Sequence, residues 1–249
     1  MVKTEENIKQ LIKLIDYTSL NTLDTISSLK DWLSTLRNKP SELQPAAICV
    51  YPNLVNDILI EVPKGIKVAV VGGAFPFNQT FPDIRKKELE IISDLNLDEV
   101  DVVVQTKHVL NNDWDLVAND LAMVRETTKS KVLKIILETS VLKDSKIIEK
   151  AAQLSIDSGA DFLKTSTGKD GAVADQNAVR TLCEVIKAHY ESTSHQIGIK
   201  VSGGVRDFEN ASLYYSIVDE ILGDKWLNPD YFRIGASSLY KNLIDELEN

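Results

Sequence analysis

The feature that most constrains the fold is a repeated alternation of short apolar runs with longer segments of helical periodicity. The runs are rich in β-branched residues and lie at 14–18, 46–51, 67–73, 99–105, 131–138, 161–166, 198–204 and 231–236. Several are apolar almost throughout, as expected of parallel strands that are buried on both faces. Because parallel neighbours need a crossover, this order predicts strands that alternate with helices.

The intervening segments carry helix start and stop signals. Asp144 precedes a segment whose apolar residues recur on one helical face, and Gly159 ends that segment. A helix is also predicted after Asn21, and the segment after Pro52 has the least regular pattern. The residues predicted to cap comparable helices are Asp83, Asp113, Asp175 and Asp207.

Eight strands and eight helices, with an extra helix ahead of the first strand, predict an α/β fold of the closed (β/α)₈ TIM-barrel type. The 249 residues suit one such barrel, and no linker rich in Gly, Ser or Pro divides them, so residues 1–249 are expected to form a single domain. The first strand is the weakest element, since residues 14–18 could extend the leading helix. An open doubly wound sheet is the alternative. In a barrel, function is expected at the C-terminal ends of the strands.

The composition limits the kinds of partner that the protein is expected to bind. A net charge of −9 argues against binding to nucleic acid or to an anionic membrane surface. No apolar run is as long as a membrane span, and the two cysteines show no disulfide or metal spacing, so a reducing cytoplasm is the expected location. An anionic substrate would therefore have to be held by a local cationic pocket.

Three charged residues interrupt the apolar strands, and their positions along the strands predict that their side chains point the same way. Side chains alternate along a strand, so Lys164 shares a side with Phe162 and Ser166, and Lys200 shares one with Ser202. If these sides and that of Asp101 face the barrel axis, the three charges converge near its top. The alternatives are strand-end residues that point to solvent, or a purely structural salt-bridge cluster.

This constellation favours Schiff-base chemistry. An ammonium beside a second amine, together with burial, lowers the pKa of that amine, and a neutral lysine attacks carbonyl groups. A nearby carboxylate such as Asp101 can move protons. The mechanism needs no metal and no cofactor, and the three histidines, His108, His189 and His195, lack ligand spacing.

A phosphate site is predicted where the last two strands end. Glycine-exposed amides, hydroxyls and a helix N-terminus all favour an anion, and this is the recurrent phosphate site of barrels. Tight turns and an ordinary helix cap are the alternative for either loop alone. The candidate residues are Gly203, Gly204, Gly235, Ser237 and Ser238, with Thr167, Gly168 and Lys169 in a loop that could reach the same anion or the sugar hydroxyls.

The blocks that carry this chemistry resemble those of the DeoC-type deoxyribose-phosphate aldolases, a family of class I aldolases. The matching blocks span nearly the whole chain: LIDYTSL, AAICVYP, DEVDVVVQ, LKIILETSVLKD, GADFLKTSTGK, IKVSGGVRD and YFRIGASSL. The resemblance implies a carbon–carbon lyase that reversibly cleaves 2-deoxy-D-ribose 5-phosphate to D-glyceraldehyde 3-phosphate and acetaldehyde in deoxyribonucleoside catabolism. It also implies that the small phosphorylated sugar and acetaldehyde are the ligands, and that a homodimer or homotetramer could form.

The resemblance assigns roles residue by residue. Lys164 would form the Schiff base, Lys200 would depress its pKa, and Asp101 would transfer protons. Asp16 and Thr18 would bind the sugar end together with Lys169. The phosphate would be held by Gly203, Gly204, Ser237 and Ser238.

Two departures and two unassigned residues accompany the resemblance. The loop FPFNQTFPD lacks a glycine that many relatives carry, and the chain ends in ELEN without the tyrosine that assists proton transfer in some relatives. Cys49 receives no role. Tyr240 could contribute to proton transfer, but it is expected to pack on the last helix. Two other functions stay open: another lysine-dependent or transaldolase-like aldolase, and a phosphosugar-binding protein without catalysis.

Overall fold

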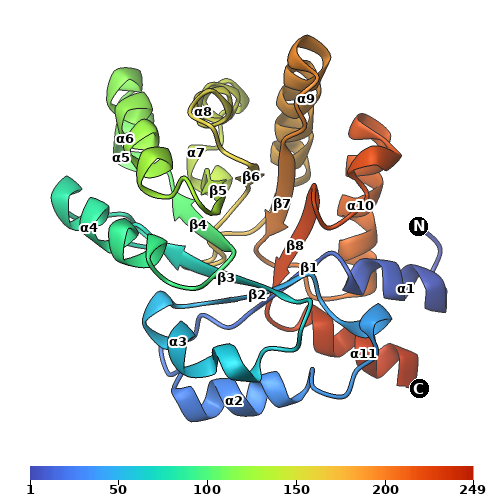
Figure 1. Ribbon diagram of the computed structural model, residues 1–249. Coiled ribbons are helices and arrows are strands. Elements are labelled where there is room, and N and C mark those ends of the chain that lie inside the picture. The colour runs from blue at the N-terminus through green and yellow to red at the C-terminus, as the bar shows by residue number, and fades with distance from the viewer. Residues whose placement is uncertain (249) are drawn as a thin grey trace.

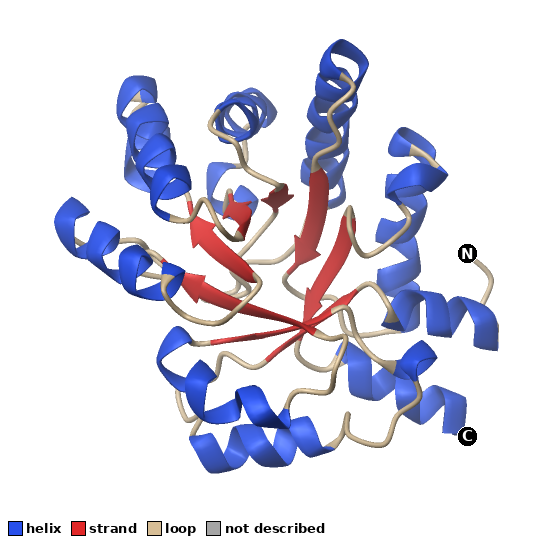
Figure 2. Ribbon diagram, viewed as in Figure 1, coloured by secondary structure: helices blue, strands red, loops and turns tan. Residues whose placement is uncertain are grey.

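The computed structural model describes residues 1–248 and contains a closed barrel of parallel strands in sequence order, β1 to β8. Figures 1 and 2 show the strands at the centre and the helices around them. The barrel prediction is confirmed, and the open sheet is excluded because β8 pairs with β1. The strands are β1 (Ile15–Thr18), β2 (Ala47–Val50), β3 (Lys67–Gly72), β4 (Glu99–Val103), β5 (Val132–Ile136), β6 (Phe162–Lys164), β7 (Gly198–Ser202) and β8 (Phe232–Ala236).

An extra helix, α1 (Glu5–Ile12), precedes β1 as predicted, and both ends of the chain lie on the same side of the barrel (Figure 1). The other helices are α2 (Ile26–Ser34), α3 (Val55–Ile58), α4 (Pro82–Ser93), α5 (Thr106–Leu110), α6 (Trp114–Thr127), α7 (Thr139–Leu142), α8 (Ser145–Asp157), α9 (Gln176–Thr193), α10 (Phe208–Leu222) and α11 (Leu239–Glu248). The irregular segment after Pro52 forms 3₁₀ turns on both sides of the short α3. None of these helices within residues 1–248 has the length and apolar character that crossing a membrane requires.

Most of the predicted helix caps are confirmed. Asp144, Asp175 and Asp207 each accept a hydrogen bond from a backbone N–H in the first turn of their helix. Asp113 occupies the cap position of α6 without a side-chain bond. The prediction for Asp83 was wrong: α4 already begins at Pro82, whose fixed φ suits a first helical position.

The helix predicted directly after Asn21 begins later, at Ile26. The Asp24 carboxylate accepts hydrogen bonds from the Asn21 backbone and from the Ser19 hydroxyl, which holds this stretch in a turn. Thr25 then starts the helix through a capping box with Ser28.

The large apolar core lies between the outer surface of the barrel and the helices, and it includes outward-facing strand residues such as Ile48, Val70 and Ile234. The inward-facing positions are different. A small apolar group there consists of Leu20, Cys49, Ala69 and Val71. The remaining interior is largely charged, which leaves the polar chemistry of the chain inside the cylinder.

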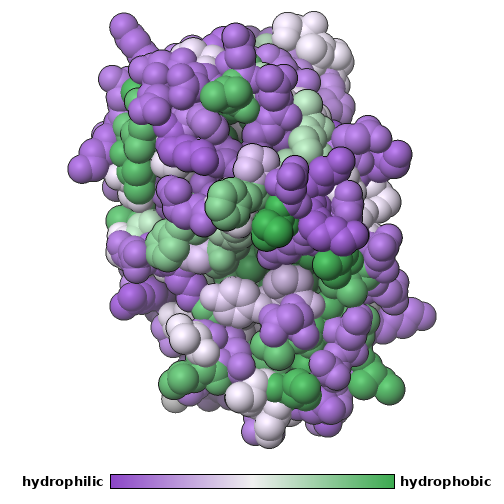
Figure 3. Space-filling model, turned by 90° about the vertical axis from the view of Figure 1, so that its left-hand side faces the viewer, coloured by the Kyte–Doolittle hydropathy of each residue, from purple (hydrophilic) through white to green (hydrophobic). Residues whose placement is uncertain are grey.

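Figure 3 shows the side that carries α4 to α6, where hydrophobic residues gather in patches among hydrophilic ones. The large exposed apolar side chains of α4 and α6 are Ile84, Ile91 and Leu116.

One glycine sets the packing at the base of the barrel interior. Gly198 on β7 pairs in register with Phe162 on β6. A Cβ at Gly198 would lie 2.3 Å from Cε1 of the Phe162 ring, so the ring occupies the space that a side chain would need. The ring in turn stacks beneath two cations, Lys134 and Arg233.

We therefore expect Gly198→Ala to lower the free energy of unfolding by about 1–3 kcal/mol, because an overpacked core must move the ring. Denaturant unfolding measures the change. Adding Phe162→Leu to the same chain should recover part of the loss, since the smaller side chain frees the space. A Gly198→Ala protein as stable as the parent would contradict the account.

Candidate active site

The strand register brings together the three charges predicted to converge. Lys164 on β6 and Lys200 on β7 are directly paired positions, so their side chains leave neighbouring strands side by side. The Lys164 Nζ lies 2.6 Å from Oδ2 of Asp101, and the Lys200 Nζ lies 2.8 Å from the same oxygen. All three side chains are buried. One carboxylate oxygen therefore holds both amines close to each other.

Four further charged residues complete the cluster. Lys134 Nζ lies 3.0 Å from Oδ1 of Asp101 and 2.5 Å from Oε2 of Glu99. Arg233 donates to Oε1 of Glu99 at 2.9 Å and to Oδ1 of Asp16 at 2.6 Å. The Lys200 Nζ lies 2.5 Å from Oδ2 of Asp16.

Sequence reasoning gave no role to Glu99, Lys134 or Arg233, although a signal was present. Lys134 and Arg233 interrupt apolar strands in the same way as Lys164, and Glu99 shares a strand face with Asp101. The alternation of strand side chains could therefore have placed all three inside the barrel.

The environment of Lys164 favours the neutral amine. Burial is the main cause that lowers its pKa, Asp101 raises it, and the nearby Lys200 ammonium lowers it again. The net result is a pKa below the ordinary lysine value. Lys164 is thus a buried base that loses its proton more readily than a surface lysine.

The neighbours of Lys164 keep their charges. Burial alone would lower the pKa of Lys200, but attraction to Asp101 and Asp16 raises it above its usual range. Burial alone would raise the pKa of the Asp101 carboxyl, but Lys134, Lys164 and Lys200 hold it well below its usual range. Lys200 therefore stays an ammonium and Asp101 stays a carboxylate. Both lie close to the Lys164 amine, which is the group that can lose its proton.

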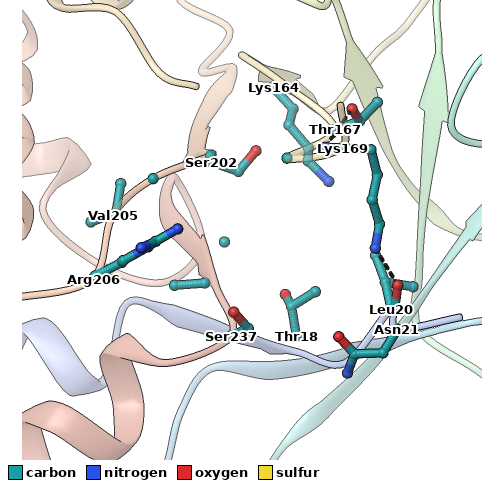
Figure 4. A pocket seen from close by; sticks show the side chains of 15 residues that line it. Thr18, Leu20, Asn21, Lys164, Thr167, Lys169, Ser202, Val205, Arg206 and Ser237 are labelled. Carbon is teal, nitrogen blue, oxygen red and sulfur yellow. Dashed lines mark hydrogen bonds between the residues drawn. The ribbon is translucent and has the colours of Figure 1, made fainter. Parts of the chain in front are cut away.

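A cavity of about 230 Å³ opens above Lys164 at the C-terminal ends of the strands. Figure 4 shows the Lys164 amine pointing into it, with Thr18 and Ser237 on the opposite side. Of the predicted site residues, those that line the cavity are Thr18, Lys164, Thr167, Gly168, Lys169, Gly203, Gly204, Gly235 and Ser237.

The cavity has a cation at each of two edges. The Arg206 guanidinium points inward from one edge, and no carboxylate within residues 1–248 forms an ion pair with it (Figure 4). At the other edge Lys169 donates a hydrogen bond to the backbone oxygen of Leu20. Sequence reasoning did not assign Arg206, although it stands in the quoted block IKVSGGVRD.

The two glycines next to Arg206 shape this edge. Gly203 and Gly204 both have positive φ, at 97° and 80°. A Cβ at Gly203 would lie 2.5 Å from the backbone oxygen of Ala172, so only glycine fits there. The loop thus presents backbone to the cavity at close range.

Other predicted residues lie outside the cavity. The Asp16 carboxylate is fully buried below it and paired with Lys200 and Arg233, while Thr18, two residues further along β1, reaches the lining. Ser238 follows Ser237 but is not part of the lining. The Cys49 thiol is buried, which raises its pKa to about 11. Tyr240 is buried and donates to the Leu43 oxygen at 2.9 Å, as its expected packing role requires.

Another unpredicted residue, Glu138, positions the loop after β6. Glu138 accepts a hydrogen bond from the Thr167 hydroxyl at 2.6 Å, and it also faces the Thr167 backbone N–H. Its φ of 53° places it in the left-handed region at the end of β5. Burial raises the pKa of this carboxyl above its usual value. Within residues 1–248 no group of three or more His, Cys, Asp and Glu is arranged to hold a metal ion.

Comparison with known proteins agrees with this geometry. The model of the DeoC/LacD family aldolases matches residues 10–222. The deoxyribose-phosphate aldolases of Mus musculus and Homo sapiens are each 32% identical over 260 residues, which cover 97% of this chain and 82% of the relative.

Solved structures share the barrel. An aldolase named QR15 is 28% identical, with a TM-score of 0.76 and coverage of 96% of both chains. The deoxyribose phosphate aldolase of Aeropyrum pernix shares the fold at 23% identity, with a TM-score of 0.74 and coverage of 98% of both chains. Because the family match spans most of its length and relatives above 30% identity cover nearly all of it, the chain belongs to the DeoC/LacD family of aldolases.

Proposed function

We propose that the protein is a Schiff-base aldolase that reversibly cleaves 2-deoxy-D-ribose 5-phosphate to D-glyceraldehyde 3-phosphate and acetaldehyde. The observation that carries the proposal is the placement of Lys164: a buried amine with a lowered pKa, beside a second amine, at the floor of a cavity with a cationic edge. The names of the 32% identical mammalian relatives support the same substrate.

The first step is attack of the neutral Lys164 amine on the aldehyde carbon of the open-chain sugar. The amine donates one N–H to Asp101, which leaves its lone pair free to point into the cavity. The carbinolamine loses water with proton transfer through Asp101 and solvent, and a protonated imine forms. The nearby Lys200 ammonium disfavours protonation of the neutral Lys164 amine before attack.

The imine then draws electrons from the neighbouring bond. Loss of the proton from the C3 hydroxyl breaks the C2–C3 bond and releases D-glyceraldehyde 3-phosphate, while the electron pair moves into an enamine. Protonation at C2 and hydrolysis release acetaldehyde and regenerate Lys164. All atoms and charges balance without an external oxidant or reductant.

The phosphate end is proposed to bind at the Gly203–Gly204 edge. Backbone N–H groups of the glycine loop, the Ser237 hydroxyl and the Arg206 guanidinium offer donors to a dianion. Gly235 keeps this wall open, since a Cβ there would lie 2.9 Å from Cε of Lys200. Thr18, Gly168 and Lys169 line the same cavity, and they are proposed to contact the sugar hydroxyls.

A non-catalytic phosphosugar binder is less consistent with the site. Such a protein needs the anion edge but gains nothing from burying Lys164 beside Lys200, because buried charges cost desolvation energy. A role in deoxyribonucleoside breakdown and a homodimeric or homotetrameric state stay predictions of the family resemblance. A cytoplasmic location stays a prediction from the composition.

Lys164→Ala is expected to abolish turnover, because within residues 1–248 no other amine lines the floor of the cavity. Acetaldehyde with borohydride should add a reduced ethyl group to Lys164 of the parent protein and nothing at that position in the variant. Peptide mass mapping locates the adduct. Full modification of another lysine with activity retained in Lys164→Ala would refute the assignment.

Lys200→Leu is expected to move the acid limb of the pH–rate profile upward by about one pH unit, because removing the ammonium raises the pKa of Lys164. The rate at neutral pH should fall for the same reason. Lys187→Leu, at an exposed position on α9, is the matched control and should leave the profile in place. An unmoved limb in Lys200→Leu would remove the role given to Lys200.

Arg206→Gln is expected to raise KM for the phosphorylated sugar about 10- to 100-fold, the range for a lost charge-assisted hydrogen bond. KM for unphosphorylated deoxyribose should stay unchanged. Arg180→Gln, which removes an exposed arginine paired with Glu220 on the outer helices, serves as the control. Equal effects on both sugars would contradict the phosphate assignment.

A further inference from the structure

The charged groups inside the barrel form a closed ring. Going round it, Asp101 contacts Lys200, which contacts Asp16, which contacts Arg233. Arg233 then contacts Glu99, Glu99 contacts Lys134, and Lys134 returns to Asp101. Every one of these six contacts is 3.0 Å or shorter.

The ring alternates in sign and is electrically neutral. Within residues 1–248 its members are three carboxylates and three cations, each carboxylate lying between two cations. Lys164 stands outside the ring and contacts it only through Asp101. A proton on Lys164 would therefore add one uncompensated positive charge to a buried site, and an uncompensated buried charge is costly.

We propose that Arg233 is a positioning residue for the aldol reaction: by completing the neutral ring, it leaves Lys164 as the surplus amine that loses its proton. Arg233 does not line the cavity, so it acts through Asp16 and Glu99 rather than on the substrate. This inference rests on the proposed Schiff-base function and extends it to a residue at the far side of the ring.

The other groups that face Lys164 are the same in every variant compared, so they do not alter the comparison. β2 contributes the Cys49 thiol, whose raised pKa keeps it neutral, and β3 contributes only Ala69 and Val71. Glu138 is held by Thr167 and forms no ion pair with the ring within residues 1–248, although its carboxylate and Lys164 attract each other electrostatically. Lys169 lines the cavity.

The ring predicts opposite effects on the protonation of Lys164 when one of its cations or one of its carboxylates is removed. Arg233→Gln leaves the ring with one excess negative charge, which a proton on Lys164 would neutralise. Glu99→Gln leaves one excess positive charge, which makes a proton on Lys164 still less favourable. The double variant is neutral again.

The test measures the pH dependence of imine formation at Lys164, by single-turnover trapping with acetaldehyde and borohydride and mass mapping. The acid limb should move up by about one pH unit in Arg233→Gln, down in Glu99→Gln, and back close to the parent value in the double variant. Arg233→Lys keeps the charge and should keep the limb in place even if it lowers the melting temperature.

The outcomes separate the two proposals. Absence of any adduct at Lys164 in the parent protein would overturn the Schiff-base function. An adduct in the parent whose pH limb is the same in all variants would overturn the ring inference alone, because a purely structural Arg233 changes stability without moving the limb. If Arg233→Gln does not fold, Glu99→Gln decides, since an upward shift or no shift there contradicts the proposal.

Discussion

The structure depends on one carboxylate. The buried Asp101 carboxylate accepts hydrogen bonds from three lysines, two on Oδ2 and one on Oδ1. Without it, the three buried amines would repel one another, and Lys164 would lose its only ion-pair partner within residues 1–248. With it, two of the amines keep their protons and form part of a balanced ring, while the third is the one that can react. The Asp101 side chain therefore both balances the buried charges and leaves Lys164 as the reactive amine.

The barrel fold offsets the free-energy cost of burying these charges. Strands that are apolar on their outer face pack against helices over a continuous core, which supplies the hydrophobic stabilisation that the interior does not. The interior can then hold charges, provided that each is paired. Phe162 and Gly198 occupy the base beneath these charges, and the cavity opens at the other end, where the labile Lys164 amine lines it.

Much of this could be predicted from the sequence because strands impose direction. Alternation along the chain was enough to place Lys164, Lys200 and Asp101 on one side of their strands, and the number of strands was enough to close the barrel. The same rule was available for Lys134 and Arg233. Their roles depend on which residue lies across the barrel, and that is set by strand stagger and closure.

The conformations of the loops, and which residues of a strand reach the cavity, could be predicted less well from the sequence. Asp16 and Thr18 lie two residues apart on one strand, yet only Thr18 reaches the cavity, because β1 ends there. Arg206 follows a glycine pair with positive φ, and the direction of a side chain after such a turn does not follow from periodicity. The late start of α2 depended on hydrogen bonds of Asp24 that no spacing rule specifies.

The most direct test is the ionisation of the Lys164 amine itself, without any substrate. Competitive acetylation of all lysines across a pH series, read out by peptide mass, gives the pKa of each amine in the folded protein. The account predicts that Lys164 titrates clearly below the ordinary lysine value of 10.5 and below every other lysine in the barrel. A Lys164 amine that stays protonated up to that value would contradict it.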